Sequence, residues 1–83
     1  MPRFFFHVVN DDRSTLDEEG IDLPDLEAAC RYARETIGAI IGEELGEGRN
    51  VIHLSIMIDD DSRVRAANIK AVTNVVESTS PFS

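Results

Sequence analysis

The sequence predicts an α+β domain in which two β-hairpins flank one long amphipathic helix, in the order ββαββ. Three patterns support it: an aromatic and apolar segment over residues 3–9, a helical periodicity over 25–45, and strict alternation over 51–59. The helix is expected to cover one face of a mainly antiparallel sheet. With 83 residues, the chain has the length of one domain, which we place at residues 1–77 with a disordered tail at 78–83.

Residues 3–9 form the first predicted strand, because aromatic and β-branched side chains favour a pleated backbone. Alternation separates two faces, one with Phe4, Phe6 and Val8 and the other with Phe5, His7 and Val9. The short polar residues at 10–14 are typical of a turn. A second strand is expected over 15–23, with a kink or bulge at Gly20.

The helix is predicted to begin at Asp25, whose carboxylate can accept hydrogen bonds from the first amides, and to extend to about Leu45. Gly38 and Gly42 lie on its polar side, where each costs about 1 kcal/mol relative to alanine. Either the helix ends near Gly42, which acts as a C-cap before a loop, or the two glycines allow the backbone of another segment to approach the helix closely. The apolar residues fall within an arc of about 120°: Leu26, Ala29, Cys30, Ala33, Ile37, Ile40 and Ile41.

Residues 51–59 form the clearest predicted strand, with Ile52, Leu54, Ile56 and Ile58 on one face and Val51, His53, Ser55 and Met57 on the other. A turn over 59–62 leads to a fourth strand over 63–72, whose interrupted alternation predicts a bulge near Ala67. A helix over 64–77 is the alternative, because several of its apolar residues would share one face.

Charge and cysteine content limit the possible partners and compartment. The net charge is −8, and residues 11–27 hold eight acids against the single base Arg13. This field repels phosphates, so we expect no direct binding of nucleic acid, whereas a basic protein is a suitable partner. Cys30 is the one cysteine, and the N-terminal apolar run is too short for a signal core or a span. We therefore expect a cytoplasmic protein with no membrane partner.

The N-terminal half resembles a known family. Met1-Pro2-Arg3 followed by three aromatics and His7, then Asp17-Glu18-Glu19-Gly20-Ile21 leading into Leu23-Pro24-Asp25-Leu26-Glu27-Ala28-Ala29, is similar to a group of small bacterial proteins classified as a domain of unknown function. The resemblance covers about residues 1–45 and continues more weakly to Ala66. It implies this fold and a bacterial origin, and it supplies no activity, cofactor or catalytic residue.

A fainter resemblance is to HicB-type antitoxins, through a short strand, a bend containing glycine, and a Leu-Pro entry into an alanine-rich helix. This resemblance implies a protein that neutralises a small basic toxin. An acidic module suits such a role electrostatically.

No catalytic, metal or nucleotide motif is present, so we expect no cofactor and no catalytic residue. The alternative is an enzyme or ligand-binding domain at His7 and His53, which are predicted on one sheet face with Ser55 nearby. Two imidazoles do not complete a zinc site of four ligands. A triad of Ser55, His53 and Asp59 is disfavoured, because neighbours along a strand point to opposite faces.

The sheet face away from the helix is the candidate interface. One helix about 10 Å across shields only one side of a sheet, and an uncovered apolar face usually marks an interaction site. We therefore expect a non-catalytic acidic module that forms a homodimer through this face or through an edge strand. The candidate interface residues are Phe5, His7, Val9, Val51, His53, Ser55 and Met57.

Overall fold

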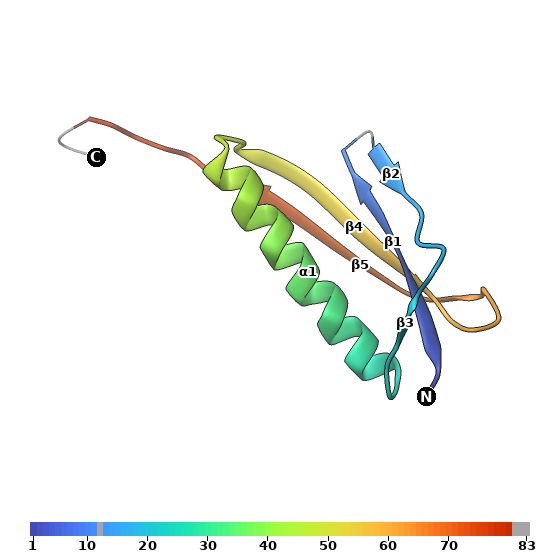
Figure 1. Cartoon of the computed structure of the whole chain (residues 1–83). Coiled ribbons are helices and arrows are strands. Elements are labelled where there is room, and N and C mark those ends of the chain that lie inside the picture. The colour runs from blue at the N-terminus through green and yellow to red at the C-terminus, as the bar shows by residue number, and fades with distance from the viewer. Residues whose placement is uncertain (12, 81–83) are drawn as a thin grey trace.

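The computed structural model of the chain describes residues 1–11 and 13–80. The turn residue Asp12 and tail residues 81–83, for which the sequence made predictions, lie outside them. The elements follow in the order β1 (Arg3–Asn10), β2 (Arg13–Thr15), β3 (Ile21–Asp22), α1 (Leu26–Gly46), β4 (Val51–Asp59) and β5 (Arg65–Asn74). One helix packs against an antiparallel sheet, which confirms the predicted α+β class (Figure 1).

The sheet has the order β2-β1-β4-β5, and β3 also pairs with β1. The continuous strand predicted over 15–23 is wrong, because residues 16–20 separate β2 from β3. Val8 pairs with Thr15 and Phe4 pairs with Ile21. The chain from Thr15 to Ile21 therefore has more residues than the part of β1 from Phe4 to Val8 that it runs along. Gly20 absorbs part of the excess with a φ of +73°, as the predicted kink requires.

The second hairpin agrees closely with the sequence. β4 spans the predicted residues, and β5 is a strand to Asn74, so the alternative helix over 64–77 is wrong. Ile58 pairs with Ala67 and Asp59 pairs with Arg65. The register therefore skips Ala66, and the bulge lies next to the predicted position.

α1 begins and ends close to the predicted limits of Asp25 and about Leu45. The Asp25 carboxylate accepts a hydrogen bond of 2.8 Å from the Ala28 amide. The helix continues through Gly42 to a C-cap at Glu47, so the predicted cap is wrong. A Cβ atom placed on Gly38 or Gly42 would meet no heavy atom within 4 Å, so no backbone of the described chain approaches them either.

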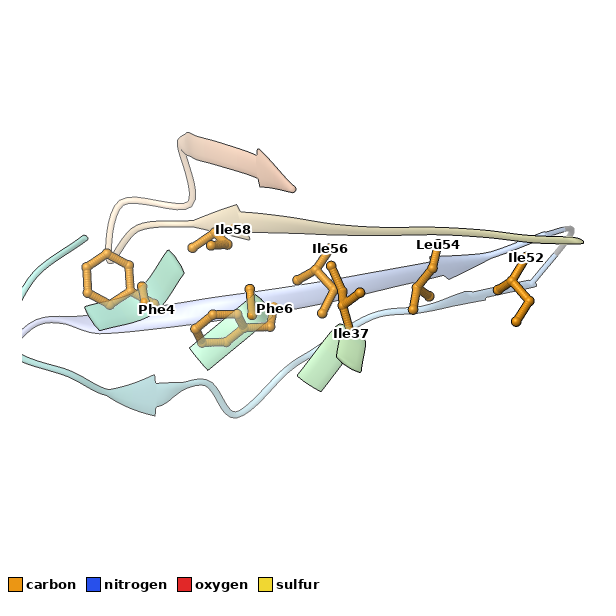
Figure 2. Close-up of a cluster of buried hydrophobic side chains, with 9 residues drawn as sticks. Phe4, Phe6, Ile37, Ile52, Leu54, Ile56 and Ile58 are labelled. Carbon is orange, nitrogen blue, oxygen red and sulfur yellow. The ribbon is translucent and has the colours of Figure 1, made fainter. Parts of the chain in front are cut away.

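The core lies between α1 and the inner side of the sheet (Figure 2). The predicted apolar stripe supplies its helical part, although Leu26 at its start is 40% exposed. α1 packs mainly on β4 and β5, which leaves the inner side of β1 beside the helix instead of beneath it (Figure 1). The buried apolar cluster consists of Phe4, Phe6, Ala29, Ala33, Ile37, Ile52, Leu54, Ile56 and Ile58.

Candidate functional site

The outer face of the sheet, away from α1, is partly closed by the chain itself. Phe5 is 6% exposed and His7 is 8% exposed, which corrects the expectation of an open face at this end. The Arg63 guanidinium lies 3.7 Å from the centroid of the Phe5 ring, and the backbone at Gly20 also reaches Phe5. Loops perform this covering, and α1 is the one helix among the described residues.

The rest of the outer face is more open. Val9, Ser55 and Met57 are half-buried, while Val51 and His53 are exposed. Val9 pairs with Ser55, and His7 pairs with Met57. These residues therefore form a mixed polar and apolar strip across β1 and β4, smaller than the sequence suggested.

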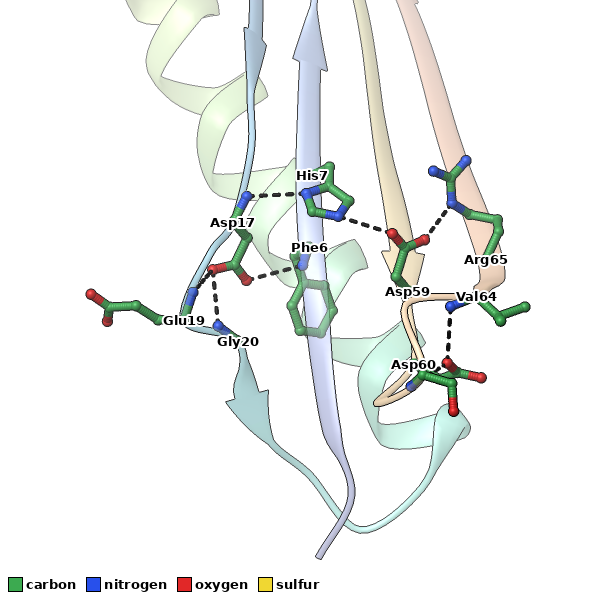
Figure 3. A network of polar contacts seen from close by, with 10 residues as sticks. Phe6, His7, Asp17, Glu19, Gly20, Asp59, Asp60, Val64 and Arg65 are labelled. Atoms are coloured by element: carbon green, nitrogen blue, oxygen red, sulfur yellow. Dashed lines mark hydrogen bonds and ion pairs between the residues drawn. The ribbon is translucent and has the colours of Figure 1, made fainter.

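His7 is the centre of a polar network on this face (Figure 3). The Asp17 amide donates to His7 Nδ1 over 3.0 Å, and His7 Nε2 lies 3.0 Å from Asp59 Oδ2. Because Nδ1 accepts a hydrogen bond, Nε2 carries the proton and donates it to the carboxylate. Arg65 Nε completes the network with a bond of 2.6 Å to Asp59 Oδ1. Side chains and backbone from four segments are thereby connected.

Asp17 fills the gap between β2 and β3. Its Oδ2 accepts a hydrogen bond of 3.0 Å from the Phe6 amide, which faces this gap. Its Oδ1 accepts bonds from the amides of Glu19 and Gly20. Burial opposes ionisation of Asp17, but these three amides and the nearby His7 outweigh it, so its pKa lies below the usual value. The carboxylate therefore replaces the missing strand contacts of β1.

Asp59 is held ionised mainly by its cationic neighbour. The hydrogen bond from Arg65 lowers the pKa of Asp59 most, burial opposes this, and the hydrogen bond from His7 lowers it further. The Asp59 carboxylate is nearly inaccessible, with 12% of the side chain exposed. It therefore acts as an internal acceptor that ties β1 to β5 across β4.

The two histidines do not lie together in a common reaction site. Both ring nitrogens of His7 are used within the chain. His53 pairs with Val72, four residues along β4 from Met57, the partner of His7. The two imidazoles are therefore about 13 Å apart along the strands, and the structure does not bring them together. No group of three metal-ligating side chains occurs within residues 1–11 and 13–80.

A second polar cluster, which the sequence did not indicate, lies at the end of α1. Glu44 is 8% exposed. Its carboxylate accepts a bond of 2.6 Å from Asn10 Nδ2 and lies 3.1 Å from Arg49 Nη1, while Arg49 also pairs with Asp11. This cluster explains why α1 continues past Gly42. Its only sequence signal is that Glu44 follows Ile40 by one helical turn on the apolar stripe.

Comparison with known proteins identifies the family. The chain belongs to the family described as domain of unknown function DUF6894, whose model matches residues 3–72. The match extends from β1 into β5 and therefore includes every element of the fold. No curated protein and no solved structure matches the chain. In the part of the chain that the structure describes, no helix has the length and apolarity to cross a membrane.

Proposed function

We propose that this domain is a non-catalytic association module, which forms a homodimer through the β5 edge, defined as residues 67–74. The observation that supports it is the position of β5 as the last strand of the sheet. Residues 67–74 pair regularly with β4, and no other described strand lies along their outer side. A long regular edge offers unpaired backbone groups to a second strand.

Charge makes this edge the most suitable contact surface of an acidic chain. Residues 62–76 contain no acid and three bases. Of these bases, Arg65 pairs with Asp59 and Arg63 stacks on Phe5, which leaves Lys70 as the main charge on the edge. Edges that are protected against pairing usually carry several charges or a proline. Two copies therefore meet here with less repulsion than elsewhere on a chain of net charge −8.

An antiparallel pairing centred on Ala71 suits these side chains best. It places each Lys70 opposite Val72 of the second copy, so that the two lysines do not face each other. With strands about 4.8 Å apart and α1 above β4 and β5, the two helices would lie about 10 Å apart, a normal helix-packing distance.

The proposed dimer also gives a reason for a glycine at position 38, which has no evident purpose in the single chain. Gly38 lines a small hollow with Ile69 and Ala71 on the β5 side of α1, and no atom of another described segment occupies the space of a side chain there. In the proposed dimer this side of the helix faces the helix of the second copy. A glycine at this point lets the two backbones approach.

Sedimentation equilibrium of two matched variants tests the proposal. Val72 is 58% exposed on β5, and Val76 is 85% exposed beyond it. Val72→Lys places a lysine opposite Lys70 at two symmetric positions and should weaken the dimer about tenfold or more. Val76→Lys adds the same charge off the strand and should dimerise like the unmodified chain. A wild-type chain that stays monomeric at millimolar concentration, or equal dimerisation of both variants, would contradict the proposal.

A further inference from the structure

α1 does not lie centrally on the inner side of the sheet. It packs mainly on β4 and β5, and a helix about 10 Å across spans about two strands of 4.8 Å spacing. The inner side of β1 is therefore bordered by α1 on one side and by residues 15–21 on the other. We call this depression the trough, and its central residues are Phe6, Val8, Tyr32, Thr36 and Ile40.

Two hollows of about 590 and 980 Å³ lie in line along the trough. The first is bordered by Tyr32 and Thr36 of α1, and the second by Ile40, Glu43 and Glu47. These residues follow one another at spacings of three and four, so they share one side of the helix. This side of α1 extends over about four turns, or roughly 22 Å. Tyr32 and Ile40 make contacts with the core at its edge, and both also border the hollows.

The floor of the trough is apolar, and acids outnumber bases along its rim. Phe6, Val8 and Ile56 line the floor, and the Tyr32 ring lies 4.9 Å from the Phe6 ring. Glu18 borders the first hollow, and Glu43 and Glu47 border the second, which Arg13 and Arg49 also line. The carboxylates of these three glutamates form no ion pair with any residue in 1–11 or 13–80.

The end of α1 makes this acidity costly for the isolated domain. Glu43, Glu44 and Glu47 gather at the negative end of the helix dipole, and the last turn of α1 contains no base. Arg49 compensates Glu44 and Asp11. Glu43 and Glu47 remain close to other negative charges, and a cation from another molecule would reduce this repulsion.

We infer that the trough binds a basic amphipathic helix of another protein. Its apolar side would lie on Phe6, Val8 and Ile40, and its lysines or arginines would lie near Glu18, Glu43 and Glu47. A helix fits because the part of the sheet beside α1 is about one helix diameter wide and because α1 offers a parallel flank. A second copy of this chain does not fit, since its α1 is acidic at its end and already packs on its own sheet.

This inference does not depend on the β5 edge, which lies on the other side of α1. The probe is a synthetic peptide of about 15 residues, with leucines at helical spacing and lysines elsewhere. The chain has one tyrosine and no tryptophan, so the emission of Tyr32 reports events in the trough itself. We expect the peptide to change this emission and a version with glutamate in place of lysine to leave it unchanged.

Matched double variants test the acidic rim. Glu43→Gln with Glu47→Gln removes two carboxylates that border the trough, and Glu35→Gln with Glu77→Gln removes two that do not. The first pair should weaken peptide binding about tenfold, and the second should change it less than about twofold. Equal effects of the two pairs, binding without a change in Tyr32 emission, or a Kd above about 100 µM would overturn the inference.

The Val72→Lys variant separates the two proposals. If the trough binds as inferred, this variant should bind the peptide as the unmodified chain does, whether or not it dimerises. Loss of dimerisation with retained peptide binding would support both proposals. A wild-type chain that remains monomeric and binds the peptide would contradict the dimer alone.

Discussion

One imidazole, that of His7, links backbone and side chains that lie far apart in the sequence. Its neutral form has one donor and one acceptor, and the structure uses both, with Asp59 on one side and the Asp17 amide on the other. An apolar residue at this place would leave the Asp17 amide without its acceptor and Asp59 Oδ2 without its donor, and such burial is costly. The network therefore specifies the positions of the β2–β3 connection and β4 relative to β1.

Removal of the Asp59 carboxylate should lower stability at neutral pH. Asp59→Asn takes a charged acceptor from Arg65 and His7, and we expect the free energy of unfolding to fall by about 2 kcal/mol at pH 7. Urea denaturation followed by circular dichroism measures this change. Glu18→Gln, at an exposed carboxylate without an ion-pair partner in the described chain, is the control and should change stability by less than about 0.5 kcal/mol.

The same substitution should change how stability depends on pH. The pKa of Asp59 in the folded chain is below its ordinary value, which is about 3.9 in an unfolded chain. The stabilisation is thus complete above about pH 4 and is lost as the pH falls through the folded pKa. The difference between wild type and Asp59→Asn should shrink below about pH 4, and a difference that is constant from pH 7 to pH 2 would contradict this account.

At the scale of elements, the bend between β2 and β3 is tightly constrained. Gly20 has a positive φ, and a Cβ atom there would lie 2.8 to 2.9 Å from Arg3, the Phe4 carbonyl and Phe5. Gly38, in contrast, has a helical backbone and open space around it. The two glycines therefore serve different elements for different reasons.

Alanine substitutions should separate these two roles. Gly20→Ala should destabilise the fold by roughly 2 to 4 kcal/mol, because it adds backbone strain to steric overlap. Gly38→Ala should stabilise the isolated domain by up to about 1 kcal/mol, because alanine favours the helix. Both are measured by urea denaturation in the Val72→Lys background, so that association does not contribute. Equal effects of the two substitutions would contradict these roles.

The elements with strong periodicity were predictable from the sequence, and those held by distant contacts were not. The alternation of residues 51–59 and the carboxylate of Asp25 determine β4 and the start of α1 locally. The end of α1 depends instead on Glu44, Asn10 and Arg49, which meet only in the folded chain. The break between β2 and β3 likewise depends on hydrogen bonds that Asp17 makes with β1.

At the scale of the whole molecule, the sequence predicted more apolar sheet surface than one helix can cover. It did not indicate where that surface would lie. The pattern within a strand separates two faces, but it does not say which strands the helix will cover or which loops will fold back. In the structure, Arg63 and the segment before β3 close one end of the outer face, while the position of α1 on β4 and β5 opens the trough on the inner side.

This distribution of surface predicts that stability depends on protein concentration. A domain of this size buries a modest fraction of its surface and gains from a partner. If folded chains dimerise through the β5 edge, mass action should raise Tm by roughly 3 to 5 °C for each tenfold increase in concentration. Differential scanning calorimetry measures this shift. Val72→Lys should reduce it, Val76→Lys should preserve it, and a Tm independent of concentration in all three proteins would show that the edge does not pair.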